Sequence, residues 1–331
     1  MHPGCFDHQE RLELLERLGD PLPKLERSVD WEAFRPLLES LYTQSDPRKG
    51  GRPPFDAVLM FKVLVLQDCY KLADDQTEFQ IRDRYSFCRF LGLTPEGRVP
   101  DAKTIWLFRE RVKQAQLIER LFEAVLVQIE AAGLTARKGQ IVDAALVPVP
   151  RQRNSRDENA RIKAGEEPEG WPENKRRQKD VQARWTKKHG KSHYGYKNHI
   201  SIDRQHKVIR KYAVSSAAVH DSQVFEVLLD EQNSSADIWA DAAYRSAERE
   251  AELREAGYRS HVHRKGKRGQ PLNARAQEAN RKRSTVRARV EHVFAQQANR
   301  LVRTIGQERA AVKIGMMNLV YNLRRLAWYA G

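Results

Sequence analysis

The spacing of apolar residues changes near residue 138, and this change constrains the fold more than any other feature of the chain. Apolar residues recur at helical intervals through most of residues 8–130. Short apolar or alternating runs of strand length follow one another after that point, starting with residues 140–147. The 331-residue chain is therefore expected to form two domains, an all-helical one over residues 1–135 and an α/β one over residues 136–331.

The second half of the chain has an element order that predicts a mixed sheet. Its expected strands are residues 140–147, 194–203, 208–214, 238–241 and 258–263, and its expected helices are 221–230, 247–256, 273–304 and 309–328. Three consecutive antiparallel strands, followed by right-handed crossovers, produce a five-stranded mixed sheet with helices on its faces. This is the order of the ribonuclease H-like fold, which we predict for the α/β domain.

The helical domain is predicted to bind DNA, because several of its helices carry basic side chains. Asp101 is expected to cap one such helix, which carries Arg109, Arg111 and Lys113. A helix-turn-helix and a plain helical bundle both fit the pattern of this domain.

The charge balance points to a polyanionic partner. The chain has 59 Lys and Arg against 44 Asp and Glu, a net charge of +15. Such a surface gains free energy by releasing the counterions of a nucleic acid, although a merely soluble basic protein would share the composition. The three cysteines are too far apart for a zinc site or a disulfide framework. With no apolar run of membrane-spanning length, we expect a cytoplasmic protein without a membrane partner.

Residues 151–192 form a polar insertion of about forty residues between the first two expected strands. The insertion lacks a regular apolar period, so we expect a functional or disordered loop. Its second half places Trp185 beside Lys187 and Lys188. Cations next to an aromatic ring suit contacts to a nucleic-acid backbone and stacking on splayed bases, whereas a mobile, solvated loop is the alternative.

Two aspartates lie within or at the end of apolar runs, where a charged side chain requires a partner. Asp143 lies within the apolar run 141–146, where an unpaired carboxylate would be costly. Asp241 ends the run 238–241 and is expected at the carboxyl edge of a central strand, where open α/β sheets place their sites. A structural ion pair would explain either residue alone.

Glu291 is the third acidic candidate, in the helix expected over residues 273–304. Its neighbours at helical spacing are small: Ala288, Ala295 and Ala298. This stripe is expected to bring the helix close to the sheet, with Arg287 on the same side. Three converging carboxylates would repel each other unless they held a hard divalent cation such as Mg²⁺. Two such ions serve in-line displacement at phosphorus, so the pattern predicts phosphodiester chemistry.

A series of motifs in fixed order resembles the bacterial insertion-sequence transposases of the DDE type, most closely the insertion-sequence-five family. The motifs are 51–55 (GRPPF), 86–93 (SFCRFLGL), 100–106 (PDAKTIW), 141–144 (IVDA), 190–197 (GKSHYGYK), 240–245 (ADAAYR) and 287–294 (RARVEHVF). The resemblance spans nearly the whole chain and implies that Asp143, Asp241 and Glu291 are the catalytic metal ligands.

The resemblance also implies residues that contact DNA. Related transposases often have a Tyr, Arg, Glu, Lys signature around the Glu; Arg287 matches it, but Ser284 and Ala298 depart from it. Arg300 is a candidate for the missing positive charge. Lys197, Tyr244 and Arg245 are further candidates, and packing of Tyr244 beneath a helix is the alternative for that residue.

These features together predict a DNA transposase that binds the ends of an insertion element, cleaves the DNA and transfers the strand to a target. The expected cofactor is Mg²⁺, with Mn²⁺ possible, and the expected assembly is a homodimer on DNA. The resemblance places the protein in a bacterial cytoplasm, associated with the nucleoid when bound. A metal-dependent nuclease without strand transfer and a non-catalytic DNA-binding protein derived from a transposase are the alternatives.

Overall fold

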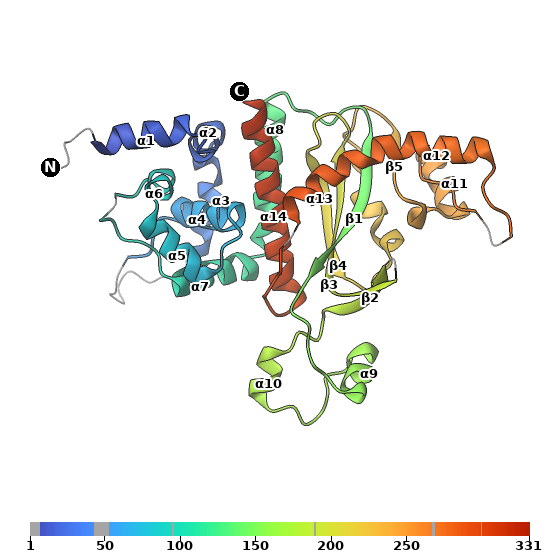
Figure 1. Ribbon diagram of the computed structural model, residues 1–331, viewed down its shortest axis with the longest axis horizontal. Helices are drawn as coiled ribbons and strands as arrows, with labels where there is room; N and C mark the ends of the chain where they lie inside the picture. The colour runs from blue at the N-terminus through green and yellow to red at the C-terminus, as the bar shows by residue number, and fades with distance from the viewer. Residues whose placement is uncertain (1–6, 43–52, 95, 189, 267–268, 299) are drawn as a thin grey trace. The chain divides into compact units, whose positions relative to one another are not determined.

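The computed structural model describes residues 7–42, 53–94, 96–188, 190–266, 269–298 and 300–331 (Figure 1). Within these ranges the chain forms two compact units, one of residues 1–133 with 315–331 and one of residues 134–314. Residues 51 and 52 of the first sequence motif lie outside the described ranges. No described helix is both long enough and apolar enough to cross a bilayer.

The first unit is helical, as expected. It contains α1 (Asp7–Arg17), α2 (Leu22–Ser28), α3 (Arg35–Glu39), α4 (Ala57–Cys69), α5 (Asp74–Asp83), α6 (Tyr85–Leu91), α7 (Ala102–Gln114), α8 (Leu117–Ala131) and the end of α14 (Gln307–Tyr329), with short 3₁₀ turns at Glu32–Phe34 and Ser40–Tyr42. Helix α4 is apolar on nearly all sides, and its Phe61 packs against Trp31 and Phe34 in the core.

Asp101 of the α7 cap agrees with the prediction, whereas Arg109 does not. Asp101 caps the helix as predicted, since its carboxylate accepts a hydrogen bond from the Thr104 N–H at 2.6 Å. Arg109 does not belong to a basic surface. Its guanidinium is buried and forms an ion pair with Asp74 at 2.7 Å.

The second unit is built on a six-stranded mixed sheet. The strands are β1 (Gln140–Pro148), β2 (Arg184–Lys188), β3 (Lys191–Asp203), β4 (Ile209–Ser216), β5 (Asp237–Trp239) and β6 (Arg259–Ser260). Strand β3 pairs antiparallel with β1, β2 and β4, whereas β1, β5 and β6 are parallel neighbours. All five expected strands are present, and β2 is an additional edge strand.

The helices of the second unit differ from the prediction in two places. The helix expected over 221–230 is a pair of 3₁₀ turns, Asp221–Val224 and Glu226–Leu228. The helix expected over 273–304 is interrupted: α12 (Ala274–Arg287) leads through a 3₁₀ turn at Ala288–Val290 into α13 (Glu291–Gln297), which ends before residue 298. The expected helix over 247–256 is confirmed as α11 (Ala247–Glu255).

The polar insertion is ordered rather than structureless. It forms α9 (Arg156–Ala164), α10 (Glu173–Gln178) and β2. Glu158, in a capping box with Ser155, accepts hydrogen bonds from the Trp171 indole at 2.6 Å and from Lys175 at 2.5 Å. Polar contacts of this kind hold the segment together without an apolar stripe, which explains why its hydrophobic pattern gave no helix or strand.

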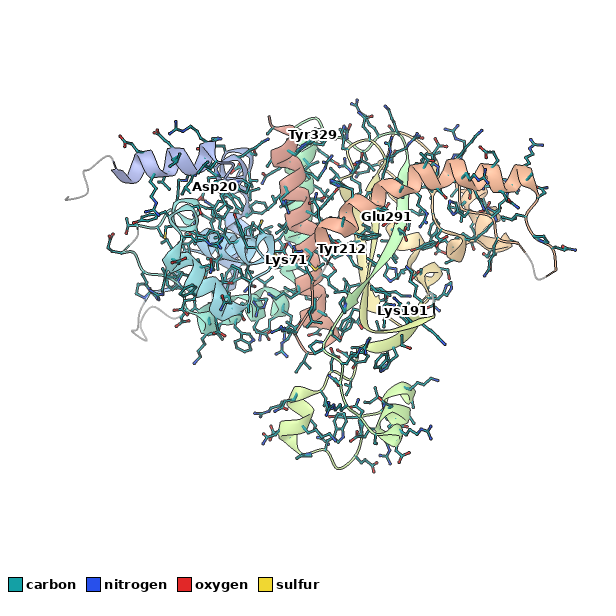
Figure 2. The ribbon with its side chains drawn as sticks, viewed as in Figure 1. Asp20, Lys71, Lys191, Tyr212, Glu291 and Tyr329 are labelled. Carbon is teal, nitrogen blue, oxygen red and sulfur yellow. The ribbon has the colours of Figure 1, made fainter. Side chains whose placement is uncertain are left out.

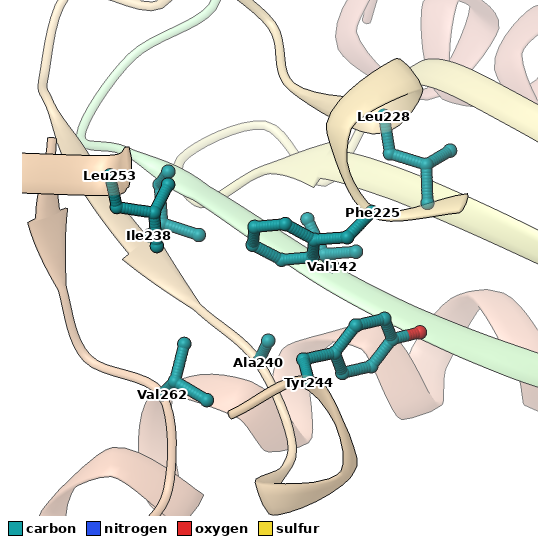
Figure 3. Close-up of a cluster of buried hydrophobic side chains, with 8 residues drawn as sticks. All are labelled: Val142, Phe225, Leu228, Ile238, Ala240, Tyr244, Leu253 and Val262. Carbon is teal, nitrogen blue, oxygen red and sulfur yellow. The ribbon is translucent and has the colours of Figure 1, made fainter. Parts of the chain in front are cut away.

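The sheet has an apolar face that fixes the direction of its polar residues. Val142, Ile238 and Ala240 pack with Phe225 and Tyr244 in one buried cluster (Figure 3). Side chains alternate between the two faces of a strand. The residues that follow Val142 and Ala240, which are Asp143 and Asp241, are therefore directed to the opposite face.

Candidate active site

Asp143 lies on β1, and Asp241 comes two residues after the end of the parallel neighbour β5. The register of β1 and β5 pairs Gln140 with Ile238, an offset of 238 − 140 = 98 residues. Asp143 and Asp241 have the same offset, 241 − 143 = 98. The backbone of Ala240 remains in strand-like pairing, since its carbonyl accepts the His263 N–H at 3.1 Å. The continued register therefore brings together the two aspartates that the sequence singled out.

The Asp143 carboxylate is largely removed from solvent, with a side chain that is 14% exposed. Its Oδ2 accepts a hydrogen bond from Arg287 Nη1 at 2.7 Å, and its Oδ1 accepts one from the Ala144 N–H at 2.8 Å. Burial raises the pKa of Asp143, the Arg287 charge opposes this rise, and the nearby Asp241 adds to it. The carboxylate therefore needs a cation, and here Arg287 provides one.

Asp241 is more open, with a side chain that is 48% exposed. Its Oδ1 accepts a hydrogen bond from the Ala242 N–H at 2.6 Å and lies 3.8 Å from His263 Nδ1. Burial lowers the pKa of His263, and the charge of Arg287 lowers it further. A neutral imidazole next to Asp241 leaves that carboxylate free to take another positive partner.

Glu291 opens α13 (labelled in Figure 2) and is exposed. The stripe of small residues does not face the sheet as expected, because Ala288, Ala295 and Ala298 are exposed as well. The opposite side of this segment is buried and contains Val290, Val293 and Gln297, which accepts a hydrogen bond from Asn198 of β3 at 3.1 Å. The 3₁₀ turn changes which residues after Arg287 face the sheet. The prediction that the stripe of small residues brings the helix close to the sheet is therefore wrong.

The three acids do not form one cluster as the side chains stand. In the described part of the chain, no group of three His, Cys, Asp or Glu residues is close enough to hold a metal ion. Asp143 and Asp241 are brought together. Glu291 follows Arg287 by four residues, so it comes from the segment that already contacts Asp143.

Several candidate DNA contacts are engaged within the protein. Tyr244 is 1% exposed and packs against Phe225, which is the packing alternative. Lys197 forms an ion pair with Asp221 at 2.8 Å and donates to the Val219 carbonyl. Arg245 forms an ion pair with Glu250 at 3.1 Å. These three side chains therefore have partners within the protein.

The basic edge strand β2 remains available to a ligand. Trp185 is 46% exposed, with its ring 5.7 Å from the Arg151 guanidinium and 5.1 Å from the Tyr194 ring. Lys187 and Lys188 are exposed on the same strand. The charge of Lys188 lowers the pKa of Asp143, against the larger effect of burial. The charge of Lys188 therefore acts on the aspartate pair. Arg300, which follows α13, is partly exposed.

Two features of this site were not predicted from the sequence. The ion pair of Asp143 with Arg287 joins residues 144 positions apart. The place of His263 beside Asp241 depends on the parallel pairing of β5 and β6. The sequence predicted a strand over residues 258–263, but only the pairing of that strand identifies the neighbour of His263.

Family models match both halves of the chain. One described as a transposase DDE domain covers residues 135–323, and one described as a transposase domain (DUF772) covers residues 10–111. The chain belongs to the DDE transposase family. The identification made from the sequence motifs is confirmed at this level, and the enzyme is a DNA transposase that cleaves DNA and transfers strands. DDE transposases generally require a divalent metal ion, and they act on DNA.

A likeness to one solved transposase structure accompanies these matches. It is described as the cryo-EM structure of the piggyBac transposase synaptic complex with hairpin DNA. The TM-score is 0.46 at 12% identity, over 94% of this chain and 75% of that chain.

The donor atoms at the aspartate pair fit a hard divalent cation. Both residues provide carboxylate oxygens, the ligand type that Mg²⁺ and Mn²⁺ prefer. The buried Asp143 already holds a cationic partner in Arg287, so the site stabilises positive charge. The donor set of the pair therefore fits the divalent cation that DDE transposases generally require.

Proposed function

We propose that Asp143, Asp241 and Glu291 hold the divalent cations of this transposase, with Mg²⁺ as the cofactor and Mn²⁺ as a substitute. The observation that carries the proposal is the proximity of the two aspartates: the register of β1 and β5, extended by two residues, pairs their positions, and the charge of Asp241 raises the pKa of Asp143. When bound, the cations activate the attacking oxygen and stabilise the leaving oxygen in displacement at phosphorus.

Glu291 is proposed to join the pair after a local rearrangement. A 3₁₀ segment within a longer helical run often marks a hinge. The turn at Ala288–Val290 has this position, between Arg287 and Glu291. Rotation about it would withdraw Arg287 from Asp143 and turn Glu291 toward the pair, leaving the guanidinium to bind a phosphate oxygen.

The strand order supports the proposal that the second unit is ribonuclease H-like. The path β4-β3-β1-β5-β6 places the three antiparallel strands on one side and the two parallel ones on the other. This is the arrangement that the predicted element order requires. In this arrangement Asp143 lies on the middle strand, β1, and Asp241 directly follows its parallel neighbour β5.

DNA is proposed to reach the site along the basic edge of the sheet. Lys187 and Lys188 would bind phosphate groups, Trp185 would stack on a splayed base, and Arg300 would add a further contact. The helical domain predicted over residues 1–135 is proposed to recognise the element ends. Because both ends of the element must be processed together, we propose a homodimer on DNA. We also propose that the protein belongs to the insertion-sequence-five family and is located in a bacterial cytoplasm.

The test uses labelled oligonucleotides that contain the terminal repeats flanking the gene. Purified enzyme is incubated with an intact element end, or with a pre-cut end and a target plasmid, in Mg²⁺, in Mn²⁺ or in EDTA. We expect Asp143→Asn, Asp241→Asn and Glu291→Gln each to abolish cleavage and joining while duplex binding persists. Normal products from any of the three variants would remove that residue from the proposed site.

The pre-cut substrate separates the transposase from a nuclease. A nuclease would release short fragments but would not join the labelled end to the plasmid, whereas the family assignment predicts joined products. The same assay decides against a non-catalytic DNA-binding protein if the wild-type enzyme gives either product in a metal-dependent manner.

A further inference from the structure

Polar side chains along one face of α12 attach the helix to β1 and to the segment that follows β6. Asn280 donates to the Arg264 carbonyl at 2.9 Å and accepts the Arg264 N–H at 3.0 Å. Arg283 donates to the Val262 carbonyl at 3.3 Å, and Arg287 reaches Asp143. Ala276 is the one buried residue of the helix. The inner face of α12 is thus defined by Ala276, Asn280, Arg283 and Arg287.

The outer face of α12 is exposed and basic. Arg275, Arg281 and Lys282 are exposed, and the exposed Glu278, the single acidic residue of the helix, is 3.5 Å from Arg281. Arg264 and Lys265 are exposed in the segment that Asn280 holds against the helix. We call these five basic residues, Arg264, Lys265, Arg275, Arg281 and Lys282, the α12 track.

We propose that the α12 track binds the sugar–phosphate backbone of the DNA segment next to the bond that is cut. The inference rests on the action of this family on DNA, but it does not depend on which carboxylates hold the metal. Its partner is duplex DNA, recognised through phosphate charge rather than base sequence.

The geometry of the helix supports this placement. With a rise of about 1.5 Å per residue, Lys282 lies about 7 Å along the axis from Arg287, and Arg275 lies about 18 Å from it. Nucleotides of one strand are spaced at about 3.4 Å, so the track spans about five base pairs outward from the residue that contacts Asp143. The track also begins next to the aspartate pair, because Arg264 follows His263, whose Nδ1 lies 3.8 Å from Asp241 Oδ1.

The charges of this region are also crowded. Burial lowers the pKa of Arg283, and the charges of Arg264 and Arg245 lower it further. The mutual repulsion of these cations opposes the folded state of the protein alone. A polyanion bound to the outer face would offset this repulsion. A surface that contacts only solvent gains nothing from concentrating positive charges beside a catalytic site.

The experiment measures DNA binding by fluorescence anisotropy, with the full-length protein in EDTA and a labelled duplex of arbitrary sequence. The observed constant is followed between about 50 and 200 mM NaCl, where each phosphate contact adds about 0.9 to the slope of log K against log salt. The test variant is Arg275→Gln with Lys282→Gln. The control is Arg137→Gln with Lys211→Gln, which removes two exposed charges elsewhere in the same unit.

We expect the test variant to lower the absolute slope by about 1.8, the value for two lost phosphate contacts, while the control keeps the wild-type slope. Arg275→Lys with Lys282→Arg retains the charges and should restore the slope, which excludes a folding defect. An unchanged slope in the test variant would overturn the proposal. A loss of affinity for polyglutamate with the DNA slope unchanged would also overturn it, and would assign the face to an acidic protein. Because EDTA removes the metal, failure here is distinct from failure of the proposed metal site.

Discussion

Arg287 donates a hydrogen bond to Asp143 at 2.7 Å, across 144 residues of sequence. The carboxylate that we propose as a metal ligand is therefore already paired with a fixed cation, and the two partners are 24% and 14% exposed. Loss of one partner from a largely buried ion pair leaves the other charge uncompensated. In this site the pair would also oppose metal binding, because Arg287 already compensates the carboxylate charge that would attract the metal cation.

Arg287→Gln is expected to lower the free energy of unfolding of the metal-free protein by about 1 to 3 kcal/mol. Addition of Mg²⁺ should then raise the melting temperature of this variant more than that of the wild type, because the ion no longer has to displace Arg287. Differential scanning fluorimetry with and without Mg²⁺ measures both effects. Arg283→Gln, on the same face but bound to a carbonyl, is the control. Equal Mg²⁺-induced shifts in all three proteins would disprove the competition.

Tyr196→Phe tests how the insertion is attached to the sheet. The buried Tyr196 hydroxyl lies 2.9 and 2.8 Å from the two carboxylate oxygens of Asp180, which is itself buried. The variant should lose about 1 to 3 kcal/mol of unfolding free energy and expose residues 151–192 to trypsin. Tyr258→Phe, at the margin of the hydrophobic cluster, should do neither. A trypsin pattern identical to that of the wild type would show that Asp180 does not anchor the insertion.

Gly195→Ala tests the close approach of β3 to β1. A Cβ at Gly195 would lie 2.2 Å from the Val147 carbonyl oxygen, so the backbone would have to shift. Gly165→Ala is the matched control, because Gly165 has a positive φ of 88° but no atom within 4 Å of the added Cβ. We expect a cost of about 1 to 2 kcal/mol at Gly165 from the backbone conformation alone, and a clearly larger cost at Gly195. Equal costs in urea unfolding would contradict the close approach.

His199 should make stability depend on pH. Burial lowers its pKa from 6.5 to about 4, so the unfolded chain binds the proton more readily than the folded chain between these values. Stability is therefore complete above pH 6.5 and falls as the pH decreases toward 4, by on the order of 3 kcal/mol. The wild type and His199→Gln should therefore differ less in their free energies of unfolding, measured in urea, as the pH decreases from 6.5 toward 4, and the order of the two can reverse. His193→Gln, on the same strand, should show the pH dependence of the wild type.

Much of the fold was predictable because its strands and helices have clear periods. The five expected strands are present, and the pairing of β3 with β4 follows from their short polar link. Strand β2 was missed because its sequence RWTKK has no buried apolar face and sits at the edge of the sheet. The insertion helices were missed for a similar reason, since Glu158 and its polar partners hold them.

The site was predictable only in part. Asp143 and Asp241 were identified because a carboxylate in or at the end of an apolar strand needs a cation. The orientation of Glu291 was not, because the 3₁₀ turn at Ala288–Val290 changes the face that follows Arg287. The pairing of Arg287 with Asp143 depends on tertiary contact, which no local pattern encodes.

Isothermal titration of Mn²⁺ into the DNA-free protein and three variants tests whether Asp143 and Asp241 bind the metal. Asp221→Asn is the control, since the charges of Asp221, Asp143 and Asp241 all raise the pKa of Tyr244, but Asp221 is bound to Lys197. We predict that the wild type and Asp221→Asn bind Mn²⁺ with the same affinity, and that Asp143→Asn and Asp241→Asn each weaken binding at least about tenfold. Undiminished Mn²⁺ affinity in both Asp143→Asn and Asp241→Asn would contradict the claim that this pair forms the metal centre.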